Sequence, residues 1–338
     1  MKIVLSTFIP IIMVLGSNNA ALPNDSLQTV SRVFYVMGTN LEFNLICKDR
    51  EYCLDAINDS IAEVKRIDKI FSNYRADSEL SGLSIQADSK VGVSQEFFDL
   101  TAFSVFISAL SRGAFDISIA PLIDVWKKES KNNKTPEANL IKSIRDICTG
   151  FDKLKLHSKD YEIGFSSDCI KLDYGAVGKG YVLQRIAQLL VNKKIENGLI
   201  NFGGNIHALG TDLQGKPWVI KIKDPDNSSE YIRTISVSNM SVSTSGGYER
   251  YFLVNSKKYS HIIDPRTGFP VSHFSSVTVV SESPLFADVL STAFSVLSLD
   301  ESKEIINQLD KISVLFIETK ANEARIYENN NFKNIASD

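Results

Sequence analysis

The order of helix-like and strand-like segments is the feature of this sequence that most constrains its fold. Residues 31–46 are rich in β-branched and aromatic side chains on both sides of Gly38, which predicts a strand pair or one bent strand. Residues 55–71 then place isoleucine and valine at helical spacing. A second helical pattern follows over residues 94–113, with Ser94 as its cap and a glycine at its end. Further helices are predicted over residues 180–192, 288–297 and 301–309.

The remaining segments predict loops and strands. Residues 127–137 are polar and run past Pro136, which predicts a surface loop before a short helix. Short strands dominate from residue 234 to residue 280, and a strand pair closes the chain near Tyr327. No regular strand-helix-strand repetition joins these segments, so we expect an α+β fold rather than a doubly wound sheet.

The charge balance limits the partners. The chain has 37 basic and 40 acidic residues, a net charge of -3, and no long basic run. Nucleic-acid binding depends on basic residues that neutralise phosphates, so we expect no nucleic-acid partner.

The N-terminus has the layout of a secretory signal. Lys2 gives a positive start, and residues 3–15 form an apolar run. We therefore predict a signal peptide over residues 1–20 and one mature domain over residues 21–338. A retained membrane anchor is the alternative, although the run is shorter than the roughly 20 residues that a spanning helix needs.

Four cysteines follow the apolar run. In an oxidising compartment they can form disulfides, and sequence alone does not choose the pairing. We favour Cys47 with Cys53 and Cys148 with Cys169, because each pair joins segments that can lie side by side as strand ends. Buried free thiols are the alternative.

The segment DYGAVGKGYVLQRI starts at Asp173, after an apolar strand end, and its glycines open the helix predicted next. Backbone N–H groups at a helix start bind anions, and Lys179 adds positive charge. The spacing matches neither the dinucleotide-binding G-x-G-x-x-G pattern nor a P-loop. A helix entry whose glycines serve close packing fits the same residues.

Asp288 and Thr292 lie four residues apart in SPLFADVLSTAFSVL, and thus on one face of the predicted helix. A carboxylate and a hydroxyl on an apolar helix suggest Mg²⁺, which prefers oxygen ligands and bound phosphate. A hydrogen bond between the two side chains is the alternative.

Three other segments place polar groups among apolar ones. In NFGGNIHALG, the glycines allow close approach of a ligand or a neighbouring strand, and His207 is interpreted as structural. SVSTSGGYERYF, from Ser241, is interpreted by itself as a hairpin turn. Asp116 has two interpretations: it accepts hydrogen bonds from nearby backbone, or it holds a ligand.

Eight short segments occur in a defined order: MGT at Met37, NYRADSEL at Asn73, GAFD at Gly113, DYGAVGKGY at Asp173, NFGGNI at Asn201, STSGGYERYF at Ser243, YSHIIDPRTGFP at Tyr259 and ADVLSTA at Ala287. This series resembles the FAD:protein FMN transferase (ApbE) family and covers nearly the whole mature chain. The resemblance implies mixed, largely antiparallel sheets with packed helices.

The resemblance also implies the binding residues. Mg²⁺ would be held by the backbone carbonyl of Ala176 and the side chains of Asp288 and Thr292. Carried over by position, the FAD site would be lined by Met37, Asn73, Tyr74, Arg75, Ala114, Phe115, Asp116, Asp173, Lys179 and Ile262.

The implied reaction attaches the FMN half of FAD to a threonine or serine hydroxyl of a target flavoprotein and releases AMP. Such phosphoryl chemistry depends on positioning and charge stabilisation, which Mg²⁺ and Lys179 would supply. His261 is our candidate base, because imidazole titrates near neutral pH. Asp264 would orient that ring or stabilise the turn that Asp-Pro favours.

Two rival functions use the same site. An FAD pyrophosphatase would let water replace the acceptor hydroxyl, and a flavin carrier would bind FAD without turnover. The resemblance implies acceptors among flavoprotein subunits of membrane respiratory complexes, and thus a periplasmic protein near the inner membrane.

Overall fold

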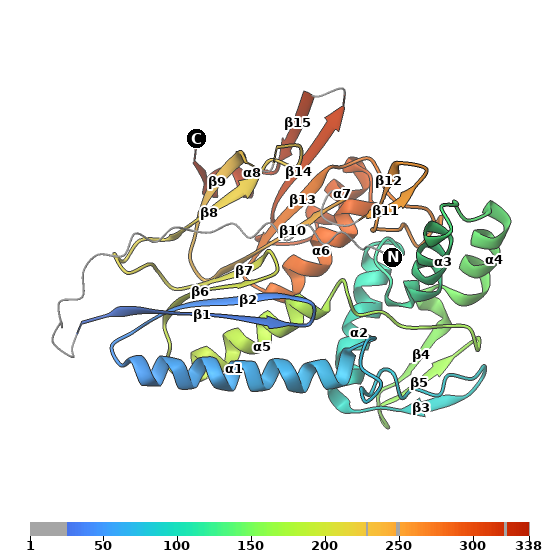
Figure 1. Ribbon diagram of the computed structural model, residues 1–338, viewed down its shortest axis with the longest axis horizontal. Coiled ribbons are helices and arrows are strands. Elements are labelled where there is room, and N and C mark those ends of the chain that lie inside the picture. The colour runs from blue at the N-terminus through green and yellow to red at the C-terminus, as the bar shows by residue number, and fades with distance from the viewer. Residues whose placement is uncertain (1–25, 228, 248–250, 321–322, 338) are drawn as a thin grey trace.

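An eight-stranded sheet forms the centre of the computed structural model, which describes residues 26–227, 229–247, 251–320 and 323–337 (Figure 1). All seven neighbouring strand pairs in this sheet are antiparallel. In spatial order its strands are β1 (Gln28–Val36), β2 (Thr39–Cys47), β6 (Asn197–Phe202), β7 (Asn205–Leu209), β10 (Met240–Gly246), β13 (Ser276–Ser281), β14 (Ser313–Lys320) and β15 (Glu323–Glu328).

Three smaller antiparallel sheets surround it. They are β16 (Ala336–Ser337), β9 (Tyr231–Val237) and β8 (Trp218–Lys223); β3 (Lys90–Gly92), β5 (Glu162–Phe165) and β4 (Leu154–His157); and the hairpin β11 (Tyr251–Val254) and β12 (Lys257–Ser260). The expected α+β fold with largely antiparallel sheets is confirmed.

Most helices lie on one face of the large sheet or beside it, and α3 (Ala120–Lys131) and α4 (Ala138–Cys148) lie at one end of the molecule (Figure 1). The others are α1 (Arg50–Phe71), α2 (Gln95–Leu110), α5 (Gly178–Asn192), α6 (Pro284–Val296), α7 (Leu299–Ile306) and α8 (Asn330–Ile335). Helices α1, α5 and α6 pack on one face, and the β8–β9 sheet with α8 packs on part of the other. Side chains of the strands between these layers point alternately to the two faces. Val279 belongs to the core under the helices, and Val280 belongs to the core under β8 and β9.

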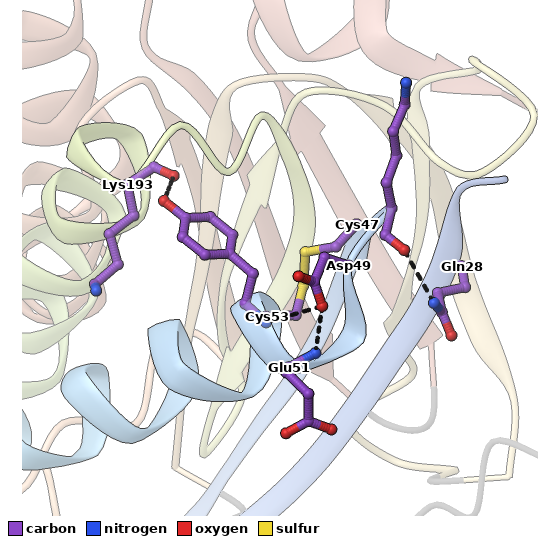
Figure 2. The surroundings of a disulfide bond; sticks show 8 residues. Gln28, Cys47, Asp49, Glu51, Cys53 and Lys193 are labelled. Carbon is purple, nitrogen blue, oxygen red and sulfur yellow. Dashed lines mark hydrogen bonds between the residues drawn. A yellow bond between two sulfur atoms is a disulfide. The ribbon is translucent and has the colours of Figure 1, made fainter. Parts of the chain in front are cut away.

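The N-terminus of α1 is fixed by a cap and a disulfide (Figure 2). The Asp49 carboxylate accepts the backbone N–H of Glu51 over 2.9 Å, so the helix begins at Arg50 rather than at the predicted residue 55. Cys53 in the first turn is bonded to Cys47 at the end of β2. This bond joins the first hairpin to α1.

The second disulfide joins Cys148, at the end of α4, to Cys169. Both favoured pairings are therefore confirmed, and the free-thiol alternative is wrong for all four cysteines.

Two predictions of local structure were wrong. Residues 127–131 form the last turns of α3 instead of a loop, because Trp126 and Leu122 bury one face of that helix and leave its lysines outside. Residues 241–246 form β10 instead of a hairpin turn, because alternate residues of the serine-rich segment contact opposite sides of the sheet. Residues 248–250 of that segment lie outside the described residues.

The predicted signal peptide, residues 1–20, lies outside the part of the chain that the structure describes. Within the described part, no helix combines the length and apolar character needed to span a membrane.

Candidate active site

The first turn of α5 holds the carboxylate of a residue on α6. The backbone N–H of Gly180 donates to Asp288 Oδ2 over 2.7 Å. The N-cap residue, Val177, makes no side-chain cap, so the first N–H groups of α5 depend on partners outside the helix. Because a helix start carries partial positive charge, a carboxylate at this point is favoured.

Asp288 is a buried carboxylate that contacts two neutral groups. Its side chain is 4% exposed, and its second contact is the Ser243 hydroxyl, 3.4 Å from Oδ1. Within the described residues, these two donors are its side-chain partners, and neither is a cation. Burial of a carboxylate without a positive partner is costly, so the position favours a bound cation.

The oxygen atoms around Asp288 come from neighbouring serines and threonine. Ser243 and Ser245 lie on the same face of β10, because strand side chains alternate. Ser245 Oγ lies 2.9 Å from Ser291 Oγ and 3.3 Å from Thr292 Oγ1. We call Ser243, Ser245, Ser291 and Thr292 the hydroxyl cluster. The structure does not show the alternative hydrogen bond between Asp288 and Thr292. The Asp288 side chain contacts α5 and β10, and the Thr292 side chain contacts β10.

Lys179 reaches the same region from α5. Its Nζ donates to Asn205 Oδ1 over 3.3 Å, and Asn205 Oδ1 also accepts the Ser243 hydroxyl over 2.8 Å. The positive charge of Lys179 and the buried Asp288 carboxylate are thereby joined in one network, which involves the four elements α5, β7, β10 and α6.

The loop before α5 folds on itself. Asp173 Oδ1 accepts the Gly175 N–H over 2.7 Å, and the Tyr174 carbonyl accepts the Gly178 N–H over 2.7 Å. The loop thus places Ala176 immediately before the helix start. Met37, in the β1–β2 turn, lies next to it, since a Cβ on Gly178 would be 4.0 Å from Met37 Cε.

Asp116 lies in a loop that is anchored by its carboxylate. Oδ1 accepts both the N–H and the hydroxyl of Ser118, and Oδ2 accepts the Phe151 N–H over 2.7 Å. Burial raises the pKa of this carboxyl, and the Ser118 and Phe151 donors oppose that rise. Asp116 thus accepts hydrogen bonds from nearby groups, as one of its two interpretations holds, and its role in holding a ligand stays a prediction. The neighbouring Ala114 and Phe115 side chains are buried in the main core, so a ligand would meet their backbone.

The Asn73–Tyr74–Arg75 turn follows α1 and lies near the surface. Tyr74 is 91% exposed, so its ring is free to cover a ligand. The Arg75 guanidinium pairs with Asp77 at 2.7 Å, and its Nε is buried without a partner among the described residues.

The 259–270 segment forms a tight turn after β12. Asp264 pairs with the Arg266 guanidinium, which also contacts Glu301 on α7 at 3.0 Å. Asp264 and Glu301 raise the pKa of Arg266 above its usual value. The Trp126 indole N–H donates to the Gly268 carbonyl over 2.9 Å. Asp264 therefore stabilises the turn, as one of its two interpretations holds.

His261 and Ile262 occupy the start of this turn. His261 is half-buried, and Ile262 is buried in the main core that also includes Val177 and Leu290. Ile262 thus anchors the segment that carries His261 to the core beneath α5 and α6.

Comparison with known proteins assigns the family. The sequence profile of the ApbE family matches residues 37–316. The chain belongs to the ApbE family. A relative from Haemophilus influenzae, named FAD:protein FMN transferase, is 30% identical over 269 residues, covering 76% of this chain and 77% of its own. A relative of the same name from Escherichia coli is 28% identical and covers 79% and 77%.

Solved ApbE structures share the fold. The flavin transferase ApbE from Vibrio cholerae superposes with a TM-score of 0.81 at 25% identity, covering 91% of this chain and 99% of its own. The ApbE protein from Thermotoga maritima gives a TM-score of 0.82 at 26% identity, covering 92% and 100%.

Within this ApbE chain, Lys179, Asp288 and Thr292 join one polar network, to which Thr292 is linked through Ser245 and Ser291, with Ala176 at the adjacent helix start. Asp116 and Asp173 belong to loops that meet, because the Asp173 N–H donates to the Ile117 carbonyl over 2.7 Å. Within the described residues, the Asp288 side chain contacts Gly180 and Ser243, whereas Arg75 of the Asn73–Arg75 turn pairs with Asp77, and His261 lies in the turn after β12.

Sequence reasoning missed Asn205 and the β10 serines as members of this site. The signal was present for β10, since serines at 241, 243 and 245 alternate with valine and threonine. His207, two residues after Asn205, is structural as predicted: it is buried, and its Nδ1 lies 2.8 Å from Ser241 Oγ.

Proposed function

We propose that the protein transfers the FMN moiety of FAD to a threonine or serine hydroxyl of a flavoprotein, with Mg²⁺ as the metal. The new bond is a phosphoester, and AMP is released. The observation that carries the proposal is the buried carboxylate of Asp288 at the N-terminus of α5, which contacts neutral donors among the described residues and shares one network with Lys179. Membership of the ApbE family, whose relatives are named for this reaction, supports it.

The residues present fit Mg²⁺. Asp288 supplies a carboxylate, Thr292 a hydroxyl and Ala176 a backbone carbonyl, all of them the oxygen donors that a hard cation prefers. Groups of three or more His, Cys, Asp or Glu that could hold a metal do not occur in the described residues, so Asp288 would be the single carboxylate of this site. A bound Mg²⁺ would neutralise negative charge on the pyrophosphate of FAD.

The protein's own groups hold the phosphates. The Lys179 ammonium and the positive end of α5 would lie toward the anion, and both would stabilise charge that develops when the phosphorus-oxygen bond to AMP breaks. The acceptor hydroxyl oxygen attacks the FMN-side phosphorus. Positioning and electrostatic stabilisation are sufficient for this chemistry, which needs no covalent protein intermediate.

His261 takes the proton of the attacking hydroxyl in this proposal. An imidazole is suited to this role near neutral pH, and its turn is rigidly held by Asp264, Arg266 and Trp126. Tyr74 would cover the isoalloxazine ring, since its exposed side chain offers an aromatic face.

The proposal is tested by incubating the protein with FAD and Mg²⁺, with and without a flavoprotein acceptor. Transfer predicts AMP release together with flavin fluorescence that stays on the acceptor after denaturation. Rapid formation of free FMN and AMP without acceptor would establish the pyrophosphatase instead. Absence of AMP at every Mg²⁺ concentration would establish a flavin carrier.

The base is tested by His261→Ala, with His157→Ala on β4 as the matched control. Transfer at saturating FAD should fall by about 10²-fold or more for His261→Ala, because a positioned base contributes on that order. The control should keep full activity. Full transfer by His261→Ala would exclude His261 as the base.

We further propose secretion to the periplasm and acceptors among flavoprotein subunits of membrane respiratory complexes. The two disulfides support an oxidising compartment, since such bonds persist there and are rare in the cytosol. Mass spectrometry of protein from a periplasmic extract should show a mature chain without residues 1–20. A full-length chain confined to the cytosol would contradict this.

A further inference from the structure

Asn205 is the first residue of β7 and lies at the centre of the polar network. Its side chain is 2% exposed. Oδ1 accepts two hydrogen bonds, from Lys179 Nζ at 3.3 Å and from Ser243 Oγ at 2.8 Å. The single Ser243 proton therefore points mainly at Asn205, and Ser243 Oγ keeps only a longer contact, 3.4 Å, with Asp288 Oδ1.

The orientation of the Asn205 amide follows from these contacts. Two donors converge on one atom, so that atom is the oxygen and the other is Nδ2. Nδ2 is buried and has no partner within the described residues. A buried donor without a partner lowers the stability of the folded protein. The side chain of Asn205 is therefore held in an orientation that is unfavourable for folding.

We propose that Asn205 is a positioning residue that holds the Lys179 ammonium group in the network of Asp288, with Ser243 as the link. This inference rests on the proposed function, in which Lys179 steadies the pyrophosphate. A lysine side chain has many rotamers, and only an acceptor fixes its charge at one place. Asn205 is a neutral acceptor, so it fixes the ammonium without adding a negative charge near Asp288 and the phosphates.

A double-mutant cycle tests whether Asn205 acts through Lys179. Asn205→Ala should lower kcat/KM for FAD by about 10- to 100-fold, the cost of misplacing a catalytic group by about 1 Å. In a Lys179→Met background the same change should have less than about a twofold effect, because nothing remains to be positioned. Equal effects in both backgrounds would overturn the proposal, as would full activity of the single variant.

Two further variants separate positioning from a structural role. Asn205→Asp keeps an acceptor oxygen for Lys179 but adds the negative charge that the neutral amide avoids, so its kcat/KM should lie between those of Asn205→Ala and the wild type. Asn205→Ala should leave the thermal midpoint nearly unchanged, since it removes two hydrogen bonds and an unsatisfied donor together.

The control is Asn197→Ala. Asn197 Oδ1 accepts the N–H and the hydroxyl of Thr211, so this change should lower the thermal midpoint and keep kcat/KM. If Asn205→Ala does not fold, Asn205→Ser carries the same cycle.

Binding of FAD without metal keeps this test independent of the proposed function. Quenching of flavin fluorescence gives the dissociation constant for the wild type, both single variants and the double variant. The same coupling should appear, with Asn205→Ala weakening binding only when Lys179 is present. A wild type that neither binds nor converts FAD would refute the proposed function. A wild type that binds FAD while the two substitutions act independently would refute only the role of Asn205.

Discussion

The backbone N–H of Gly180 donates to the carboxylate of Asp288 over 2.7 Å, and this contact joins α5 to α6 at the polar network. A Cβ at residue 180 would lie 2.5 Å from Asp288 Cβ and 2.7 Å from the Pro284 carbonyl oxygen. Both distances are shorter than real Cβ contacts, and the atoms belong to packed helices that have little room to move. The missing side chain of Gly180 is therefore what lets the carboxylate reach the helix start.

We predict that Gly180→Ala separates α5 from α6. Overpacking of this kind costs about 1–3 kcal/mol in the free energy of unfolding, and it displaces Asp288. Thermal unfolding and FAD turnover should both decline. Gly178→Ala is the matched control, because a Cβ there meets only Met37 Cε at 4.0 Å. A Gly180→Ala protein as stable and active as Gly178→Ala would contradict this view of the contact.

We predict that Asp288→Asn keeps the fold and loses the response to Mg²⁺. The amide oxygen still accepts the Gly180 N–H, but the negative charge that a cation requires is gone. Turnover measured across a Mg²⁺ titration should be low and flat. Thr292→Val should give a weaker effect, since it removes a neutral ligand. An unaltered Mg²⁺ dependence in Asp288→Asn would remove this residue from the metal site.

We predict that His207 makes the protein less stable in acid. Burial lowers the pKa of His207 from 6.5 to about 4, so the folded state keeps the ring neutral. The unfolded state takes up a proton at higher pH, and stability therefore falls as pH decreases from about 6.5 to about 4. The difference corresponds to about 3 kcal/mol at the acid end.

Urea unfolding at several pH values checks this dependence. His207→Asn, which removes the titrating ring, should flatten the slope between pH 6.5 and pH 4. Equal slopes for His207→Asn and the wild type would show that another group controls the acid response.

We predict that the Cys148–Cys169 disulfide contributes more to the free energy of unfolding than the Cys47–Cys53 disulfide. It closes the longer loop, with a sequence separation of 21 against 6. Chain entropy alone gives about 3 kcal/mol for the longer loop and about 2 kcal/mol for the shorter. Double Cys→Ser variants, compared by urea unfolding, should show this order.

The longer disulfide also lies beside the Asp116 loop. Residues 150 and 151, just after Cys148, donate to Ser118 Oγ and Asp116 Oδ2 at 2.7 Å. Loss of Cys148–Cys169 should therefore weaken FAD binding, whereas loss of Cys47–Cys53 should not. Equal FAD affinities in the two double variants would separate the disulfide from the binding loop.

Local pattern predicted the elements whose stabilising contacts lie close in sequence. Ser94 caps α2 as expected, because a serine side chain satisfies a helix start from within its own segment. The extent of α3 depended on burial of Trp126 against distant aromatic rings, which a polar-looking segment does not reveal. The start of α1 depended on the Asp49 cap, which helical periodicity does not measure.

The same distinction explains which residues of the candidate site could be predicted from the sequence. Asp288 and Thr292 could be paired from the sequence, because one helix turn fixes their spacing. Asn205 and Ser243 are 38 residues apart and come together only through the pairing of β7 with β10. Such a contact depends on strand order, which no single segment encodes.

Trp126 gives the protein an optical reporter on the turn that carries His261. Its indole N–H is bonded to the Gly268 carbonyl, and the rings of Phe252, Tyr259 and Phe269 lie around it. Indole emission depends on hydrogen bonding and on the polarity of the surroundings. The chain has one other tryptophan, Trp218 on β8, so Trp218→Phe leaves Trp126 as the sole emitter. Arrival of FAD or of an acceptor protein could then be followed in real time, without any attached dye.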